Sequence, residues 1–342
     1  MMTPQAHPTA TPELDWNKPL VTIRCITYNH EAYIRDALEG FVMQQTSFPF
    51  EAIVHDDAST DHTADIIREY AQKYPHIIKP ILQTENQHSK GKNSRMRADI
   101  NAAMSPHSQF IALCEGDDYW TDPKKLQLQA DFMLSHDDVT LCFHNAMFHF
   151  EKGVNKRFVK QLDANGNPID YPVKDDMEDR FYTFEETWNK WFHPTASWLI
   201  RRSVFSSDIY QKMVTIPTLN GDDKLRYSCA KLGRLYSFSK IMSVYRIQPS
   251  GMSQGFQESY SHSFIFNTYA IKILELGEPY QKQFKEYFYK ALHNSLIVIV
   301  RRLNGWQQHM KNVKAVYKHD KVIVLTAILK FPFKYIWQHI KE

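Results

Sequence analysis

The residues with the clearest chemical potential are 114–120, which read CEGDDYW. In an extended chain, side chains at i and i+2 project to the same side, so Glu115 and Asp117 can reach one cation together, with Asp118 beside them. Carboxylates with room for water suit Mg²⁺ or Mn²⁺, which commonly bridge to diphosphate oxygens, and Gly116 would let a phosphate approach the backbone. The pattern predicts a metal site, and the alternative is a solvated acidic turn. Because three neighbouring carboxylates repel one another, some compensation is expected.

A second acidic pair, Asp56 and Asp57, directly follows the apolar run at residues 50–55. A carboxylate at a strand end can accept the ring N–H of a uracil, which would favour a pyrimidine nucleotide. The alternative is an N-cap for the helix that follows, a position that Asp, Ser and Thr all fill well. Tyr28 and Asn29 end the preceding apolar run and strengthen the nucleotide interpretation.

A third acidic pair, Asp222 and Asp223, follows Asn220 and Gly221 at the start of a predicted helix. One of the two carboxylates could take a proton from an acceptor hydroxyl. The alternative is again helix capping. His193 lies before another predicted strand, and we assign it no catalytic role, because a lone histidine is more often structural.

Apolar runs and helical periodicity alternate along the chain. Strands alternating with helices imply βαβ units and a mainly parallel sheet, in which ligands bind outside the carboxyl ends of the strands. The two acidic clusters at 56–57 and 115–118 should therefore meet at one sheet edge. Strands are expected at 20–27, 50–55, 77–82, 109–114, 139–150, 196–200 and 235–245. Helices are expected at 31–44, 63–74, 93–104, 124–135, 184–192 and 222–232, with a long loop or hairpin over 151–182.

Composition narrows the class of protein. The chain has 342 residues, 43% of them apolar, which is enough for a sizeable core. Its four cysteines are widely spaced and form no CxxC pair, which favours reduced thiols in a cytoplasmic compartment. Residues 1–17 are expected to be a disordered leader, and no apolar stretch approaches the roughly 20 residues that span a bilayer.

Charge is concentrated at the carboxyl-terminal end. Residues 281–342 hold 12 Lys and Arg against 3 Asp and Glu, whereas the remainder holds 29 against 35. Such a basic tail favours a specific anionic surface rather than nucleic acid. Residues 321–342 are also apolar and aromatic, which suits a helix lying in the interface of the cytoplasmic membrane. The alternative is a helix that packs on the catalytic domain.

The order LVTIRCITYN, FEAIVHDDASTD, FIALCEGDDYW and GDD before a helix resembles family 2 glycosyltransferases. The resemblance covers about residues 18–250 and implies a GT-A fold, an α/β architecture with a Rossmann-like, mainly parallel sheet flanked by helices. We expect a catalytic domain at 18–255 and a basic helical extension at 256–342. The resemblance further implies a metal-dependent, inverting transferase that uses a nucleotide-diphospho-sugar. Its acceptor would be a surface glycan, such as a lipopolysaccharide or capsule precursor on a lipid carrier.

The resemblance also implies roles for individual residues. Nucleotide contacts fall on Thr27, Asn29, Asp56, Asp57 and Asp117, with Arg95 and Arg97 as the two candidates for a diphosphate contact. Metal binding by Mn²⁺ or Mg²⁺ falls on Glu115 and Asp117, followed by Asp118, and the catalytic base falls on Asp223 or Asp222.

Two features depart from the family pattern. Glu115 stands where the DxD motif has its first Asp, and its longer side chain could reach a metal directly or through water. The QxxRW motif of processive members is absent, and residues 245–251 occupy its place, which favours a single-addition transferase. Two alternatives remain: a nucleotidyltransferase, which would normally show a glycine-rich basic loop near its first strand, and a non-catalytic carbohydrate- or nucleotide-binding protein.

Overall fold

The computed structural model describes residues 14–154, 159–187, 193–214, 221–249 and 251, with runs of one to three residues between 292 and 329. The expected leader and most of the expected basic extension lie outside these residues. The chain divides into two units, which are described separately. The first contains Met1–His149, Pro168–Ser203 and Cys229–Arg246, and the second contains Phe150–Asn167, Val204–Ser228 and Ile247–Glu342.

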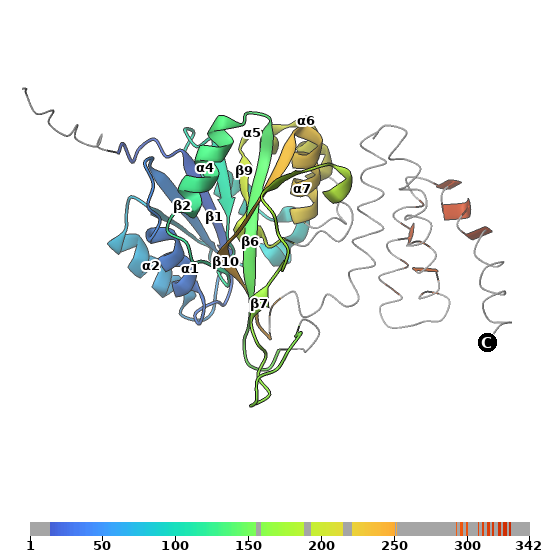
Figure 1. The fold of residues 1–342 in the computed structure, drawn as a ribbon, viewed down its shortest axis with the longest axis horizontal. Coiled ribbons are helices and arrows are strands. Elements are labelled where there is room, and N and C mark those ends of the chain that lie inside the picture. The colour runs from blue at the N-terminus through green and yellow to red at the C-terminus, as the bar shows by residue number, and fades with distance from the viewer. Residues whose placement is uncertain are drawn as a thin grey trace, which may run out of the picture. The chain divides into compact units, whose positions relative to one another are not determined.

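A ten-stranded mixed sheet forms the centre of the fold (Figure 1). Four strands pair in parallel in the order β3, β2, β1, β4, and β9 then pairs antiparallel with β4 and β6. The path continues through β10 to β5, while β7 pairs with β6 and β8 with β10. The predicted α/β fold is confirmed. The strands are β1 (Val21–Thr27), β2 (Phe50–Asp56), β3 (Ile78–Leu82), β4 (Phe110–Leu113), β5 (Tyr119–Trp120), β6 (Val139–Phe150), β7 (Tyr171–Pro172), β8 (Arg180–Tyr182), β9 (Leu199–Arg201) and β10 (Arg234–Ile247).

Apolar residues at helical spacing give a helix one face that can be buried, and α1 shows this pattern. In α1, Ile34, Leu38 and Phe41 are fully buried, and α1 lies beside α2 in Figure 1. The helices are α1 (Ile34–Val42), α2 (Thr63–Lys73), α3 (Met96–Ala103), α4 (Lys125–Ser135), α5 (Ser203–Ser206), α6 (Asp208–Val214) and α7 (Gly221–Leu232). Shorter 3₁₀ turns are η1 (His88–Asn93), η3 (Glu185–Thr187) and η4 (Thr195–Ser197). Among the described residues, no helix combines the length and apolar character needed to cross a membrane.

Three predicted elements differ from the structure. The helix expected at 93–104 begins later, at Met96, because Ser94 is extended before α3. The strand expected at 196–200 begins later, because the Ser197 amide and hydroxyl both donate to the Pro194 carbonyl and close η4. The segment 151–182 contains β7 and β8, and residues 188–192 of the helix expected at 184–192 lie outside the described part.

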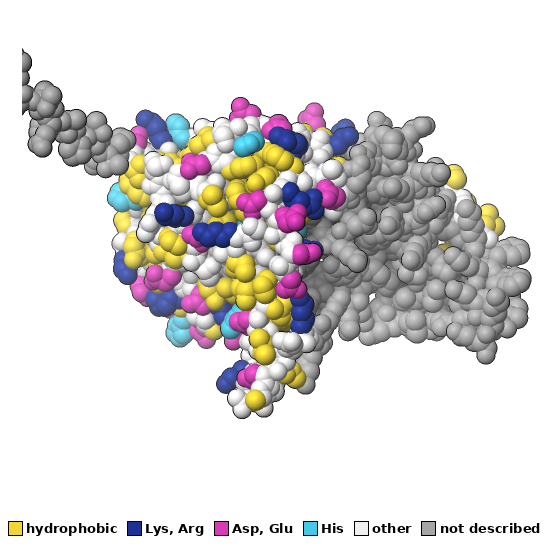
Figure 2. Space-filling view, in the orientation of Figure 1, with side chains coloured by type: hydrophobic (Ala, Val, Ile, Leu, Met, Phe, Trp, Pro, Cys, Tyr) yellow, Lys and Arg dark blue, Asp and Glu magenta, His cyan; other side chains and the backbone are white. Residues whose placement is uncertain are grey.

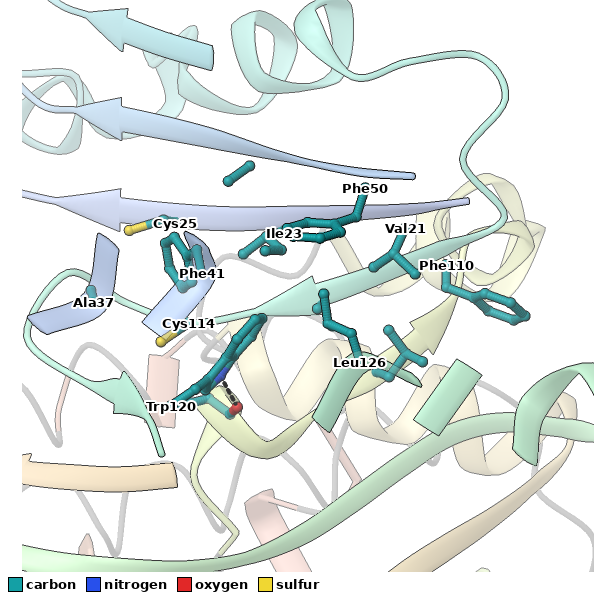
Figure 3. Packing of buried hydrophobic residues seen from close by; sticks show 14 of the residues in the cluster. Val21, Ile23, Cys25, Ala37, Phe41, Phe50, Phe110, Cys114, Trp120 and Leu126 are labelled. Carbon is teal, nitrogen blue, oxygen red and sulfur yellow. Dashed lines mark hydrogen bonds between the residues drawn. The ribbon is translucent and has the colours of Figure 1, made fainter. Parts of the chain in front are cut away.

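The core contains a fully buried lysine, Lys125. Trp120 packs edge-on against Phe41 and donates its Nε1 to the Ala196 carbonyl at 2.8 Å (Figure 3). The Nζ of fully buried Lys125 lies 4.0 Å from the Trp120 ring centroid and donates to Gln129 Oε1 at 2.7 Å. Burial lowers the pKa of Lys125 to about 7. On the surface, in contrast, acidic and basic side chains are interspersed over the face in Figure 2.

Lys125 gives the fold a measurable pH dependence. Between pH 7 and about 10 the unfolded chain carries a proton on this amine that the native state has released, so stability rises with pH in that window. We expect the free energy of unfolding to increase by about 2 kcal/mol more between pH 7 and pH 9 in the native sequence than in Lys125→Met. Urea denaturation at the two pH values measures this difference. Equal pH slopes for the two proteins would show that Lys125 keeps its ordinary pKa.

Candidate active site

The carboxyl ends of β1, β2 and β4 bring the two amino-terminal acidic clusters together. Thr27, the last residue of β1, pairs in register with Asp56, and the Asp57 amide donates to the Thr27 carbonyl at 3.0 Å. On the other side of β1, the Gly116 amide donates to the Ile26 carbonyl at 3.0 Å. The clusters at 56–57 and 115–118 therefore flank the end of one strand, as the topology argument predicted.

Gly116 is required by packing, a reason that the sequence did not indicate. A Cβ at this position would lie 2.5 Å from Thr27 Oγ1 and 3.1 Å from His30 Nδ1. Both of those atoms are buried and have no hydrogen-bond partner in the described structure. The absent side chain thus makes room for Thr27 and His30, and close approach of a phosphate is not needed to explain it.

Asp56 and Asp57 organise the loops around the strand ends. Asp56 accepts hydrogen bonds from the Ser59 amide, at 3.1 Å, and from the Ser59 hydroxyl. Asp57 accepts the backbone amides of Gln87 and His88 at 2.7 and 3.0 Å. Neither carboxylate caps α2, so the capping alternative does not describe this site. Both residues are buried, at 1% and 2% exposure, at the end of β2 and directly after it.

Asn29 lies in a strained turn after β1. Its φ of +54° falls in the left-handed region, which Asn tolerates better than most residues. The side-chain Oδ1 accepts the Thr60 amide at 2.8 Å, and the Asn29 amide donates to the Ser59 hydroxyl at 2.8 Å. These contacts join the end of β1 to the loop after β2, so Asn29 shapes the turn while its surface remains exposed.

The structure distinguishes the two candidate arginines. Gln87, whose amide is held by Asp57, accepts the Arg95 amide on its side-chain oxygen at 3.1 Å. The backbone of Arg95 is therefore tied to the strand-end loops, and its exposed guanidinium lies 3.3 Å from Asp99. Arg97 lies two residues further on, within α3, and is exposed.

The three carboxylates of residues 115–118 have different surroundings. Glu115 accepts the Thr195 hydroxyl at 2.6 Å, which joins this loop to η4. Asp117 is partly exposed, and its Oδ2 lies 3.9 Å from His30 Nε2. Burial lowers the pKa of His30, an effect that the charge of Asp117 opposes. The Asp118 side chain is buried, and its Oδ1 accepts the Arg246 amide at 2.9 Å.

Asp118 is therefore an internal support of the loop, and its role as a metal ligand stays a prediction. Burial, followed by the charges of Asp117 and Glu115, raises the pKa of Asp118 well above its usual range. Its protonated form is favoured, which reduces the repulsion expected among the three groups.

Arg246 is the residue that the sequence prediction missed. Besides its amide contact to Asp118, its Nε donates to the Asp117 carbonyl at 2.9 Å, and its terminal nitrogen lies 2.6 Å from Asp36 Oδ2. The only available signal was its place in the segment that replaces the QxxRW motif.

A metal ion is compatible with this donor set in a limited way. Within the described ranges, no three His, Cys, Asp or Glu side chains are grouped to hold a metal. Mg²⁺ and related ions, however, are commonly held by one or two carboxylates plus water and substrate phosphates. Asp117 offers such a carboxylate, and Glu115, whose Oε2 accepts from Thr195, offers a second.

The sequence comparison identifies the family of this chain. The profile described as Glycosyl transferase family 2 matches residues 22–208, which include β1, β2, β4 and the acidic loop. The chain belongs to glycosyl transferase family 2. An uncharacterized protein of Mycobacterium tuberculosis is 46% identical over 133 residues, a match that covers 39% of this chain and 37% of that protein. The putative teichuronic acid biosynthesis glycosyltransferase TuaG of Bacillus subtilis is 32% identical over 117 residues, covering 34% of this chain and 43% of TuaG.

The fold of the chain resembles that of a solved structure. S. aureus TarS residues 1–349, in complex with UDP-GlcNAc, superpose with a TM-score of 0.53 at 18% identity, covering 91% of this chain and 80% of the TarS chain. The GT-A fold expected for family 2 is confirmed by this likeness.

Asp222 and Asp223, where the family resemblance implies the base, lie in the second unit. They occupy the first turn of α7, and Asp223 Oδ1 accepts from Arg226 at 2.9 Å. Asp222 is exposed, whereas Asp223 is partly buried beside the almost fully buried Arg226. The sequence therefore located the helix start correctly, and Arg226 is an additional neighbour that it did not indicate.

Proposed function

We propose that this protein is an inverting glycosyltransferase that moves a sugar from a nucleotide-diphospho-sugar, most simply a UDP-sugar, to a hydroxyl of a glycan or lipid-linked acceptor. The observation that carries the proposal is the partly exposed Asp117 beside the ends of β1 and β2, in a chain of family 2. The complex of TarS with UDP-GlcNAc supports a uridine nucleotide, and the similarity to TuaG supports a surface-glycan acceptor.

The donor nucleotide would lie over the strand ends. Asp56 and Asp57 would face the base and ribose, because their carboxylates retain lone pairs beyond those used by Ser59, Gln87 and His88. Thr27, at the end of β1, and Asn29, in the turn that follows, would also contact the nucleotide. Arg95 is the preferred diphosphate contact, since its backbone is fixed through Gln87 and its guanidinium is exposed.

A divalent cation, Mn²⁺ or Mg²⁺, would be held by Asp117, with Glu115 as a second carboxylate. When bound, such an ion neutralises the charge that develops on a departing diphosphate. His30, which lies shortly after the end of β1, would line this position, and its burial favours the neutral imidazole. Asp118, whose Oδ1 already accepts the Arg246 amide, would be the third carboxylate beside them.

The reaction would be a single displacement at the anomeric carbon. Asp223 accepts the proton of the acceptor hydroxyl while the oxygen of that hydroxyl forms a bond to the anomeric carbon. The oxygen approaches from the face opposite the departing diphosphate. The bond between the carbon and the diphosphate oxygen breaks, and its electron pair leaves with the nucleotide. Because one displacement occurs, the configuration of the sugar is inverted. Arg226 would hold the Asp223 carboxylate in one orientation.

The donor proposal predicts a metal-linked binding defect in Asp117→Asn. We expect Mn²⁺ to tighten UDP binding to the native protein and to have little effect on the variant, with transfer abolished and the fold retained. Calorimetric titration of UDP with Mn²⁺ or EDTA, alongside circular dichroism, measures both properties. Full activity in EDTA would refute the metal requirement.

A panel of labelled nucleotide sugars separates the proposal from its two alternatives. Donor hydrolysis or transfer supports the glycosyltransferase, pyrophosphate release supports a nucleotidyltransferase, and binding without turnover supports a non-catalytic protein.

The base assignment predicts a selective loss of turnover. Asp223→Asn should leave the Kd for the donor nearly unchanged and lower kcat by about two orders of magnitude or more, because general-base assistance is lost. Asp222→Asn is the matched control, one residue away on the same helix turn. A large loss in Asp222→Asn together with an active Asp223→Asn would move the role to Asp222.

We also propose that the carboxyl-terminal tail binds an anionic lipid surface. Residues 330–342 lie outside the described part, but the described residues between 321 and 329 are helical. Val322, Leu325 and Leu329 are 72%, 47% and 72% exposed, whereas Val324 is buried. Residues three and seven apart share one helix face, so this face presents apolar side chains to solvent. Together with the basic balance of residues 281–342, the exposed face favours a lipid partner over a fully packed helix.

The tail proposal predicts salt-sensitive binding to vesicles. The full chain should sediment with vesicles containing phosphatidylglycerol at low salt and less at high salt, since each basic residue near the surface contributes about 1 kcal/mol. Val322→Ser/Leu325→Ser/Leu329→Ser should weaken sedimentation without lowering the melting temperature. Absence of binding at low salt would end the proposal.

A further inference from the structure

Arg246 contacts two consecutive residues of the acidic loop through different atoms. Its backbone amide donates to the Asp118 carboxylate at 2.9 Å, and its Nε donates to the Asp117 carbonyl at 2.9 Å. Both contacts depend on β10 lying beside β5, where Ser243 pairs with Trp120 and Val244 with Tyr119. β10, in which Arg246 is the penultimate residue, therefore sets the position of the loop backbone immediately before β5.

The other end of the guanidinium is also fixed. It pairs with Asp36 of α1 at 2.6 Å and lies over the rings of Tyr33 and Tyr119, with its carbon 4.8 and 5.2 Å from their centroids. A planar guanidinium can make these contacts together, whereas a lysine ammonium offers a single point of attachment. Arg246 thus ties the acidic loop to α1 as well as to β10.

These contacts leave the Arg246 side chain only 7% exposed. Its Nε and one terminal nitrogen are already used within the protein, so its principal contacts are with the loop and α1. Its charge pairs with Asp36 and opposes the rise in the pKa of Asp118 that burial causes. Asp117, the partly exposed carboxylate of the loop, is held through its own carbonyl, which fixes the backbone from which its side chain projects.

We infer that Arg246 is a positioning residue that holds the 115–118 loop in the conformation in which Asp117 can bind a divalent cation. The inference rests on the proposed function, since it assigns Asp117 to the metal. It separates two properties that a general structural role would change together: metal-linked nucleotide affinity, which requires the loop conformation, and metal-independent nucleotide affinity, which depends mainly on the ends of β1 and β2.

Titration of UDP in Mn²⁺ and in EDTA tests this separation. Arg246→Lys keeps the positive charge but loses the planar guanidinium that contacts both the loop and α1. We expect its Kd for UDP in Mn²⁺ to rise by about tenfold, because a lost charge-assisted hydrogen bond has an effect of this order. In EDTA its Kd should change by less than about threefold. Asp36→Asn removes the outer anchor and keeps both loop contacts, so it should produce a smaller change in the same direction, which covers the case in which Arg246→Lys folds poorly.

Arg35→Lys is the matched control. Arg35 also lies on α1, but its described contacts are with α2: it donates two hydrogen bonds to Glu69 at 3.0 Å and lies over the Tyr70 ring. Its UDP affinity should be native in both conditions. Equal losses in Mn²⁺ and EDTA for Arg246→Lys and Asp36→Asn, or no loss in either variant, would overturn the positioning role while leaving the proposed function intact. If Mn²⁺ fails to tighten UDP binding in the native protein, the metal-dependent part of the proposed function fails, and this inference fails with it.

Discussion

Mutual repulsion among the carboxylates after β4 is the constraint on which the site depends. Glu115, Asp117 and Asp118 are neighbours at the end of a buried strand, where charge is poorly screened. The structure resolves the conflict by giving each group a different environment. Thr195 donates to Glu115, Asp118 is buried in a state that favours its protonated form, and Arg246 contributes a cation to the same loop. Asp117 remains partly exposed, so one carboxylate is available to a ligand without three being forced together.

The same loop connects otherwise separate parts of the first unit. Its Gly116 allows Thr27 and His30 to pack at the end of β1, and Glu115 contacts η4 through Thr195. Trp120, which follows the loop, lies against α1 and is bound to the Ala196 carbonyl (Figure 3). Because β1, β4, α1, η4 and β10 all contact residues 115–120, a change in any of them can alter the site. Residues that never touch a substrate can therefore affect activity.

The loops after β2 and β3 follow a different principle. Here hydrogen bonds, rather than charge pairs, determine the conformation: Asp57 accepts two consecutive backbone amides, and Gln87 passes the connection on to Arg95. Such contacts satisfy backbone groups that would otherwise need water, and they fix the loop without a regular element. Carboxylate–amide hydrogen bonds thus fix the loops after β2 and β3 on one side of the proposed nucleotide site. On the other side, charge compensation fixes the loop of residues 115–118.

The sequence by itself determined the order of strands and helices in the amino-terminal half and the convergence of residues 56–57 with 115–118. Hydrophobic periodicity is local, and parallel strands place their carboxyl ends at one edge, so these features need no knowledge of packing. It could not show that Asp118 points into the protein, that Gly116 is required by Thr27 and His30, or that Arg246 reaches across from β10. Nor could it anticipate η4, which a single turn at Pro194 closes. These features arise between residues up to 210 positions apart, as in the bond from Arg246 to Asp36. Tertiary structure decides them, because burial and hydrogen-bond partners depend on which strands become neighbours.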